Sequence, residues 1–554
     1  MDNQRVFIWA ALALVLWLNY LAWQRDYPPE PVSAAPGVSA PASQAPEDTL
    51  PDLPSSSGAP AAPRSAEGAA RAEPQAATIR VVTDVLDMDI STRGGDLIRA
   101  DLLDYPVAKN RPDELVRLFD TQGNLFVARS GLRLAERRAE PTHLALFQAE
   151  KTEYRLEPGS ERLVVPLTWT DDDGVTVVKT YTFEPGSYRI HLDYEVHNET
   201  GTQLEAASYV QLVRHYEHVE RSYFNVESYA YRGPAIFDGR RYLRLDVEDA
   251  EDARFQATIT GGWIAAMQHH FVAAAVPPTN KPYDFQLSVN PQNDFTLSYR
   301  GPLAAIPAGG SAQFAETLFV GPKLQRQLAA TGPKLERVAD YGMLTILSEP
   351  LFKLLQWVHS FVGNWGWSIV IVTFLIKLAF YRLTAASGRS MAKLRNLAPR
   401  IKALQERYKD DREQLGRQMM ELYKREKINP LAGCLPILIQ IPFFLAFYWV
   451  LLESVEMRQA PFIGWINDLS TRDPYFVLPI LMGLAMFGQF KLQPMPSADP
   501  MQAKIFAFMP VVMTVMMAWF PAGLVLYWFT NTLLSIAQQW RINKLVAAET
   551  GKKT

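Results

Sequence analysis

The sequence predicts a multi-domain protein: a large antiparallel β sandwich followed by a polytopic α-helical membrane domain, with six transmembrane helices in all. Three observations support this fold class. Polar and apolar residues alternate in short runs over residues 78–331, most long apolar runs fall within residues 361–536, and a further apolar run lies near the N-terminus. A chain of 554 residues is long enough for two or three domains. The net charge of −3 and the hydrophobic content of 48% therefore average two unlike halves.

The N-terminal apolar run predicts a membrane anchor. Val6–Trp23 follows Arg5, and no small-residue cleavage pattern comes after it. The run is also longer than the core of a secretory signal peptide. We expect residues 1–23 to form an uncleaved signal-anchor helix. Residues 24–77, rich in Pro, Ala, Ser and Gly, predict a disordered linker because they hold too few large apolar residues for a core.

Period-two alternation predicts the β sandwich over residues 78–331. Residues 188–196 alternate strictly between apolar and polar, Thr176–Phe183 is a second strand, and 184–187 between them is a turn. Asp173-Gly174 and Asp238-Gly239 are further hairpin signals. Many short strands separated by turns over about 250 residues are typical of a large antiparallel sandwich.

An amphipathic segment connects the sandwich to the apolar runs. Lys323–Thr331 is predicted to be a helix that closes the β domain. Residues 332–360 then predict an amphipathic helix in the membrane interface, interrupted near Pro350. The alternative is an ordinary helix packed on the β domain.

The apolar runs predict a five-helix membrane core over residues 361–540. Several runs are near the lower limit of the 17–25 residues that span a bilayer, which implies a thinned bilayer or a sheltered, water-filled recess. Residues 382–427 carry thirteen Lys or Arg against six Asp or Glu, so this loop is expected in the cytoplasm. Both termini, including the basic tail 541–554, then lie in the cytoplasm and the β domain lies outside. The expected spans are Phe361–Tyr381, Leu435–Leu452, Tyr475–Phe490, Ile505–Phe520 and Ala522–Ile536.

Lys377 is a charged residue inside the first of these spans. A charge at the bilayer centre costs roughly 2.5–3.5 kcal/mol on insertion scales, so it persists where water or a polar partner meets it. Either Lys377 lies near a helix end and extends its ammonium to the headgroups, or it stands in a wet functional site. The three apolar residues and Tyr381 that follow it favour the second interpretation. Thr373 lies one turn earlier on the same helix face.

The loop at 382–428 predicts a basic helical hairpin. Apolar residues recur at spacings of three and four from Met391 to Tyr408, and Asp411 is positioned to cap a second helix. Its charge either enforces topology or docks acidic lipid, ribosomal RNA or a nascent chain. The candidate docking residues are Arg395, Arg400, Lys402 and Arg407.

Seven runs of the membrane half occur in a specific order and spacing: Pro350–Leu355, His359–Gly366, Asn429–Cys434, Pro436 with Gln440–Phe443, Arg458–Phe462, Asp499–Met501 and Phe520–Tyr527. In these runs the chain resembles the YidC family of membrane-protein insertases, and the resemblance covers the whole membrane half. The anchor, linker and β domain are similar to the form found in bacteria with two membranes, whose periplasmic β domain is similar in fold to sugar-binding super-sandwiches.

The resemblance implies a groove, open to the cytoplasm and to lipid, that carries one positive charge. The corresponding position usually holds arginine, whereas this chain has Lys377. Lysine keeps a point charge but lacks the planar fork of arginine. Gln440 and Thr530 are candidate polar groove residues beside Thr373, although interhelical hydrogen bonds would explain them equally well. The apolar part of a client would leave along helices that carry Pro442, Phe443 and Met509.

The implied function is insertion and folding of newly made inner-membrane proteins, alone or with the Sec translocon. The implied partners are nascent membrane proteins, the Sec translocon, the ribosome and anionic lipids, with no soluble small-molecule substrate. We expect no enzyme activity, cofactor or metal, and no Gly-rich Lys-Ser/Thr loop for a nucleotide is present. Two alternatives remain: a secondary transporter that uses the intramembrane lysine, and a membrane-tethered periplasmic binding module.

Overall fold

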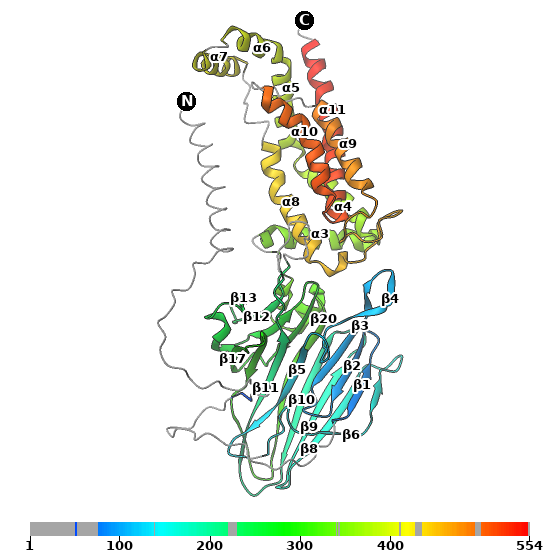
Figure 1. The fold of residues 1–554 in the computed structure, drawn as a ribbon, viewed down its shortest axis with the longest axis vertical. Helices are drawn as coiled ribbons and strands as arrows, with labels where there is room; N and C mark the ends of the chain where they lie inside the picture. Colours follow the sequence, from blue (N-terminus) through cyan, green and yellow to red (C-terminus); the bar gives the residue numbers. More distant parts are fainter. Residues whose placement is uncertain are drawn as a thin grey trace. The chain divides into compact units, whose positions relative to one another are not determined.

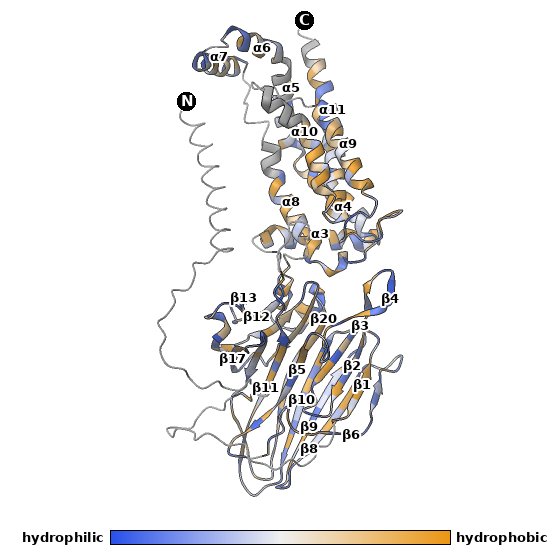
Figure 2. Ribbon diagram, viewed as in Figure 1, coloured by the Kyte–Doolittle hydropathy of each residue, from blue (hydrophilic) through white to orange (hydrophobic). Residues whose placement is uncertain are grey.

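The described part of the chain consists of a β-rich portion followed by a helical portion (Figure 1). The computed structural model describes residues 50–51, 76–137, 139–219, 230–339, 341, 344–408, 411–426, 435–492 and 500–551. The predicted anchor 1–23 and nearly all of the linker 24–77 lie outside these residues. Hydrophobic and hydrophilic residues alternate along many strands, whereas hydrophobic residues predominate in four helices (Figure 2). These are α4 (Trp365–Ala379), α8 (Leu435–Glu453), α9 (Val477–Leu492) and α10 (Pro500–Met517).

Within the described residues, eleven strands form the first sheet of the β domain. They pair antiparallel except β1 with β7, which pair parallel. The order along the sheet is β14 (Gln256–Thr260), β17 (Pro282–Val289), β18 (Asp294–Arg300), β11 (Leu204–His215), β5 (Phe126–Leu134), β3 (Leu97–Ala108), β2 (Leu86–Ser91), β1 (Thr78–Val82) and β7 (Glu153–Arg155), with β19 (Ala304–Ile306) on β11 and β4 (Arg111–Arg117) on β3.

The second sheet has nine strands in the same described part of the chain. Its printed pairs are all antiparallel. The order is β13 (Tyr242–Arg244), β12 (Gly233–Phe237), β15 (Trp263–Met267), β16 (Phe271–Val276), β20 (Ser311–Pro322), β10 (Arg189–Asn198), β9 (Val175–Phe183), β8 (Leu163–Thr170) and β6 (Gln148–Ala149).

The strands predicted by alternation are confirmed. β9 and β10 pair across the turn at 184–187, and the apolar set of β10 from Ile190 to Val196 is fully buried. The two Asp-Gly turns join β8 to β9 and β12 to β13, with Gly174 and Gly239 in the left-handed region that these turns require.

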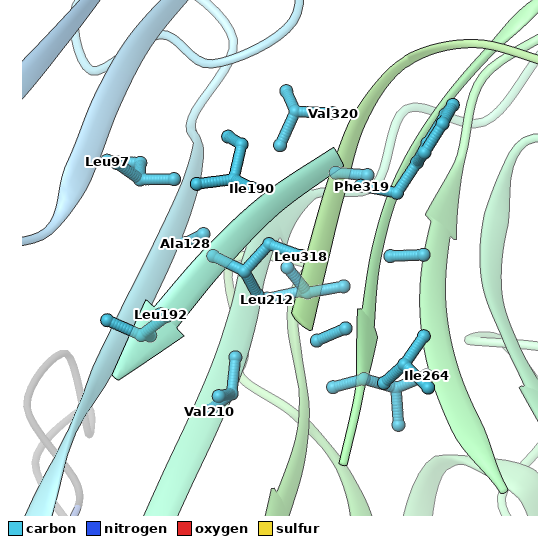
Figure 3. Close-up of a cluster of buried hydrophobic side chains, with 14 of the residues drawn as sticks. Leu97, Ala128, Ile190, Leu192, Val210, Leu212, Ile264, Leu318, Phe319 and Val320 are labelled. Carbon is cyan, nitrogen blue, oxygen red and sulfur yellow. The ribbon is translucent and has the colours of Figure 1, made fainter. Parts of the chain in front are cut away.

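The core of the β domain lies between the two sheets. Figure 3 shows side chains of β3, β5 and β11 from the first sheet meeting those of β10, β15 and β20 from the second. Each buried Leu, Ile or Val contributes roughly 1.5–3 kcal/mol through area removed from water. The labelled residues are Leu97, Ala128, Val210 and Leu212 on the first sheet and Ile190, Leu192, Ile264, Leu318, Phe319 and Val320 on the second.

Helices follow the last strand. A short helix closes the β domain as predicted. The helices are α2 (Gln325–Thr331), η3 (Leu335–Val338), α3 (Thr345–Val362), α4 (Trp365–Ala379), α5 (Tyr381–Asn396), α6 (Ala398–Arg407), α7 (Arg412–Arg425), α8 (Leu435–Glu453), η6 (Val455–Met457), α9 (Val477–Leu492), α10 (Pro500–Met517) and α11 (Ala522–Gly551).

The interfacial segment differs from the prediction in one respect. The expected interruption near Pro350 is wrong, because α3 runs unbroken through this proline. Pro350 lies in the second turn, where its missing N–H removes the hydrogen bond to the Ile346 carbonyl without ending the helix. The amphipathic character is present: Phe352 and Leu355 are fully buried, whereas Lys353 and Ser360 are exposed. The exposed residues also include the apolar Ile346, at 91%, and Phe361, at 74%.

Among the described residues, no one helix combines the length and hydropathy expected of a membrane span. Trp365–Ala379 and Tyr381–Ser390 meet both criteria only as a pair, across a bend of 66°. The last helix, α11, is 30 residues long and continues well beyond the expected end of its span at Ile536.

The predicted helical hairpin forms from α6 and α7. The Asp411 side chain accepts a hydrogen bond from the Gln414 backbone at 2.9 Å, which confirms the predicted cap. Leu397 and Ile401 pack against Met419 and Leu422. The hairpin therefore has its own small apolar core.

Candidate functional site

The helical core that holds the candidate site is built around one apolar cluster. Buried side chains of α3, α4, α8, α9, α10 and α11 contribute to it. Phe447 of α8 stacks on Tyr527 of α11 with ring centroids 4.3 Å apart. Stacking of buried rings adds stability beyond that gained from the area they bury, so this pair holds α8 against α11.

Lys377 lies in the last turn of α4. The expected span ended at Tyr381, but the helix ends at Ala379, so Lys377 is closer to a helix end than the pattern indicated. The chain then turns through the 66° bend into α5. The side chain is partly buried and is directed to α11.

The Lys377 ammonium is held by a hydroxyl rather than by a counter-ion. Its Nζ donates to Ser535 Oγ at 2.7 Å, and Ser535 Oγ donates to the Asn531 carbonyl at 2.7 Å. Within the described residues, no carboxylate forms an ion pair with Lys377. The site therefore presents a positive charge without a neutralising partner in that part of the chain.

The three polar groove candidates have different environments. Thr373 is buried, and its hydroxyl donates to the Ile369 carbonyl of its own helix at 2.6 Å. Thr530 is buried on α11, and Gln440 is partly buried on α8. Their predicted roles beside Lys377 remain predictions.

Ser535 and Gln538 are the residues that sequence reasoning missed. Gln538 Nε2 donates to Thr384 Oγ1 of α5 at 2.7 Å, one turn after Ser535. A signal was available: Asn531, Ser535 and Gln538 recur at spacings of four and three in a largely apolar helix. Such spacing places them on one face. The sequence alone does not show which face of α11 is directed to α4.

The residues predicted to line the exit path lie on α8 and α10. Pro442 is exposed, and Phe443 packs edge-on against Phe380, between α4 and α5, with ring centroids 5.4 Å apart. Met509 is partly buried on α10. These helices and α9 also expose many large apolar residues. The exposed large apolar residues of these helices include Ile441, Leu445, Ile480, Leu484, Phe487, Phe508, Val511, Val512 and Val515.

The docking candidates lie on or beside the hairpin. Arg400 is exposed and pairs with Glu426 at 2.9 Å, and Arg407 is exposed beside the Tyr408 ring. An exposed pair of this type contributes little to stability. The side chains of Arg395 and Lys402 lie outside the described residues.

A metal site does not emerge from the part of the chain that the structure describes. No group of three or more His, Cys, Asp or Glu side chains is arranged there to hold an ion. His215 contacts Asp294 at 2.7 Å, and His218 contacts Glu248 at 2.8 Å, each as a pair without a further ligand among the described residues.

Comparison with known proteins identifies the class. The family model described as YidC periplasmic domain matches residues 78–354, and the model described as 60Kd inner membrane protein matches residues 357–549. Relatives in Thioalkalivibrio sulfidiphilus and Methylococcus capsulatus are 48% and 44% identical, and each match covers 100% of both chains. Both relatives are named membrane protein insertase YidC.

The chain is thus a membrane-protein insertase with a periplasmic β sandwich. It belongs to the YidC family. A solved structure described as an active YidC insertase matches 84% of this chain and 92% of its own length, at 17% identity and a TM-score of 0.38. The assignment rests on the sequence matches, which confirm the resemblance and do not favour the transporter alternative.

Proposed function

We propose that the chain inserts membrane proteins through a hydrophilic, lipid-open groove whose one positive charge is Lys377. The observation that carries this proposal is the partly buried Lys377 ammonium, held by Ser535 with no carboxylate paired to it in the described residues. A cation that is shielded from bulk water and lacks a counter-ion attracts acidic groups more strongly than an exposed one. Acidic outer segments of clients are therefore the favoured ligands.

The energy for insertion comes from the client itself. Its apolar segment leaves along α8 and α10, past Pro442, Phe443 and Met509, and is stabilised by burial in lipid. The membrane potential adds about 2.3 kcal/mol per charge per 100 mV. α4 and α9 are 15 and 16 residues long, below the length that spans a bilayer of ordinary thickness. A thinned bilayer around these helices lowers the remaining cost of moving a polar segment.

The topology and partners belong to the same proposal. Six helices span the membrane, both termini are cytoplasmic, and the hairpin carries the exposed cations Arg400 and Arg407 on the cytoplasmic side. Exposed Arg and Lys near a membrane surface favour anionic lipid and ribosomal RNA. Cooperation with the Sec translocon and docking of the ribosome are expected from the family.

The test is a client series with one apolar segment and outer segments that carry from zero to four acidic residues. Insertion is measured at matched amounts of wild type, Lys377→Arg, Lys377→Ala and Lys377→Glu. We expect the arginine variant to insert all clients and the glutamate variant to fail with acidic ones. The alanine variant should lose insertion in proportion to client acidity.

A flat response of Lys377→Ala across the series would contradict the groove-charge mechanism. In that case, Lys377 would act as a headgroup anchor, and Lys377→Glu would mainly lower the amount of protein in the membrane.

A further inference from the structure

We infer that Ser535 is the positioning residue of the groove charge: it fixes the Lys377 ammonium on the α11 face so that acidic client segments meet a preorganised cation. This inference rests on the proposed function. It goes further by assigning the selectivity for acidic segments to a pair of residues, 158 positions apart in sequence, rather than to the lysine alone.

The direction of the hydrogen bonds supports this role. Ser535 has one hydroxyl hydrogen, and it is donated to the Asn531 carbonyl at 2.7 Å. The oxygen can therefore only accept from Lys377, whose ammonium can only donate. A hydrogen bond with a charged donor is stronger than a neutral one, and the adjacent bond to the carbonyl polarises it further.

The chemistry of lysine explains why such a partner matters. A lysine side chain ends a flexible four-carbon stem that adopts many rotamers, and its charge is a compact point. Without a partner, the ammonium would occupy many positions, and each client carboxylate would have to order the lysine side chain on binding. The bond to Ser535 supplies this order in advance, which lowers the entropic cost of client binding. Two of the three N–H groups remain for a carboxylate, since Ser535 is the one acceptor that the described residues offer Lys377.

The support of Ser535 is itself rigid. α11 contacts α4 and α5 along one face, and Gln538 donates to Thr384 of α5 one turn later. Ser535 therefore presents its oxygen from a helix that is anchored on both sides of the α4–α5 bend. A site on packed helices holds its groups more closely than a site on loops.

The experiment compares Ser535→Ala, Ser535→Thr, Lys377→Ala and the double variant Ser535→Ala/Lys377→Ala on the graded client series. Ser535→Ala should lower insertion of the most acidic client about tenfold and leave the uncharged client unchanged. Ser535→Thr should restore insertion, because threonine also donates to the carbonyl four residues earlier. The double variant should match Lys377→Ala, since Ser535 acts through the lysine.

Gln538→Ala is the matched control, because it removes a hydrogen bond between α11 and α5 without touching Lys377. It should affect all clients equally or none. If Ser535→Ala showed the same uniform profile, its role would be structural and the inference wrong. A graded loss in Lys377→Ala with wild-type behaviour in Ser535→Ala would also refute the positioning role, while leaving the proposed function intact. A flat response in Lys377→Ala would overturn both.

Discussion

Gly483 of α9 lies directly against Thr514 of α10. A Cβ on Gly483 would be 1.9 Å from Thr514 Oγ1, closer than any real contact of this kind. The threonine hydroxyl donates to the Pro510 carbonyl at 2.7 Å, so its side chain is held in place. Close approach through small residues is how membrane helices gain packing energy. The pair therefore sets the distance between α9 and α10.

Gly483→Ala should destabilise the helical core, since one methyl group forces the two helices apart. We expect a lower thermal unfolding temperature in detergent and less protein in the membrane. The matched control is Gly488→Ala on the same helix, where the nearest atom outside the helix backbone lies 4.0 Å from the added Cβ. There the substitution should be neutral or stabilising by up to about 1 kcal/mol, because alanine favours a helix. Equal stability of the two variants would contradict the close packing.

The orientation can be tested with single cysteines. In a Cys434→Ser background, we expect Glu161→Cys, exposed in the β domain, to react with an impermeant thiol reagent from the periplasmic side. Ala403→Cys, exposed on α6, should react only after the membrane is opened. Labelling is measured by the mass shift of the protein in intact and lysed spheroplasts. Reaction of Ala403→Cys in intact spheroplasts would reverse the predicted topology.

The basic hairpin should be needed for insertion but not for stability. Replacing residues 398–425 by a short Gly-Ser linker removes α6 and α7 but keeps α5, whose Ala392 packs on Ile542 and Val546 of α11. The membrane helices should therefore persist, while insertion falls severalfold because the docking cations are gone. Insertion is measured at matched protein amounts.

A milder variant separates charge from fold in the hairpin. Arg400→Gln/Arg407→Gln removes two exposed cations and leaves the apolar contact of Ile401 with α7 intact. At low salt this variant should lower insertion partly. Its deficit relative to the wild type should be smaller at high salt, where surface charges are screened. Full insertion by the variant that lacks residues 398–425 would mean that the hairpin serves only to set the topology.

Glu316 should make the stability of the periplasmic domain depend on pH. Burial raises the pKa of Glu316 to about 7, despite hydrogen bonds that Tyr299 and Ser208 donate to it at 2.7 Å. The folded state thus favours the protonated carboxyl. Its contribution is complete below the unfolded pKa near 4.5 and is lost as the pH rises through about 7. Between pH 5 and 8.5 the loss should approach about 3 kcal/mol.

The measurement is amide hydrogen exchange of β18 and β20 in the whole protein at several pH values, corrected for the intrinsic rate. Glu316→Gln mimics the neutral carboxyl, so its β20 protection should change less between pH 5 and 8.5 than that of the wild type. β1 and β2, far from Glu316 in strand order, provide an internal reference. Parallel pH profiles of wild type and variant in β20 would contradict the buried-acid interpretation.

Local features could be predicted from sequence because their causes are local. The alternation from Ile190 to Val196 follows from one buried sheet face, and the Asp-Gly turns from the backbone that tight hairpins require. The cap at Asp411 could be predicted because the first N–H groups of a helix have no backbone partner and need another acceptor. The order of strands within each sheet and the parallel pairing of β1 with β7 could not be predicted, because they depend on pairings between distant segments.

Only part of the candidate site could be predicted, because the rest also depends on contacts between distant segments. Lys377 stands out because a charge in an apolar run needs an explanation, whereas Ser535 is an ordinary helical residue until α11 is placed beside α4. The bend after Ala379 was also missed, since neither proline nor glycine occurs there. The bend lies against α11: Gln538 donates to the Thr384 hydroxyl at 2.7 Å and to the Tyr381 carbonyl at 3.5 Å, contacts that depend on the tertiary placement of α11.

The length of α11 has a consequence for how events at the membrane surface reach the groove. At 1.5 Å per residue its 30 residues extend about 45 Å, some 15 Å more than the hydrocarbon layer is thick. The same uninterrupted helix carries Ser535, which binds Lys377, and Ile542 and Val546, which pack on Ala392 of α5. α5 leads into the hairpin, so one continuous helix joins the contacts at α5 to the Lys377 site. In the proposed function, docking at the hairpin and binding of a client at Lys377 would therefore act on the same helix.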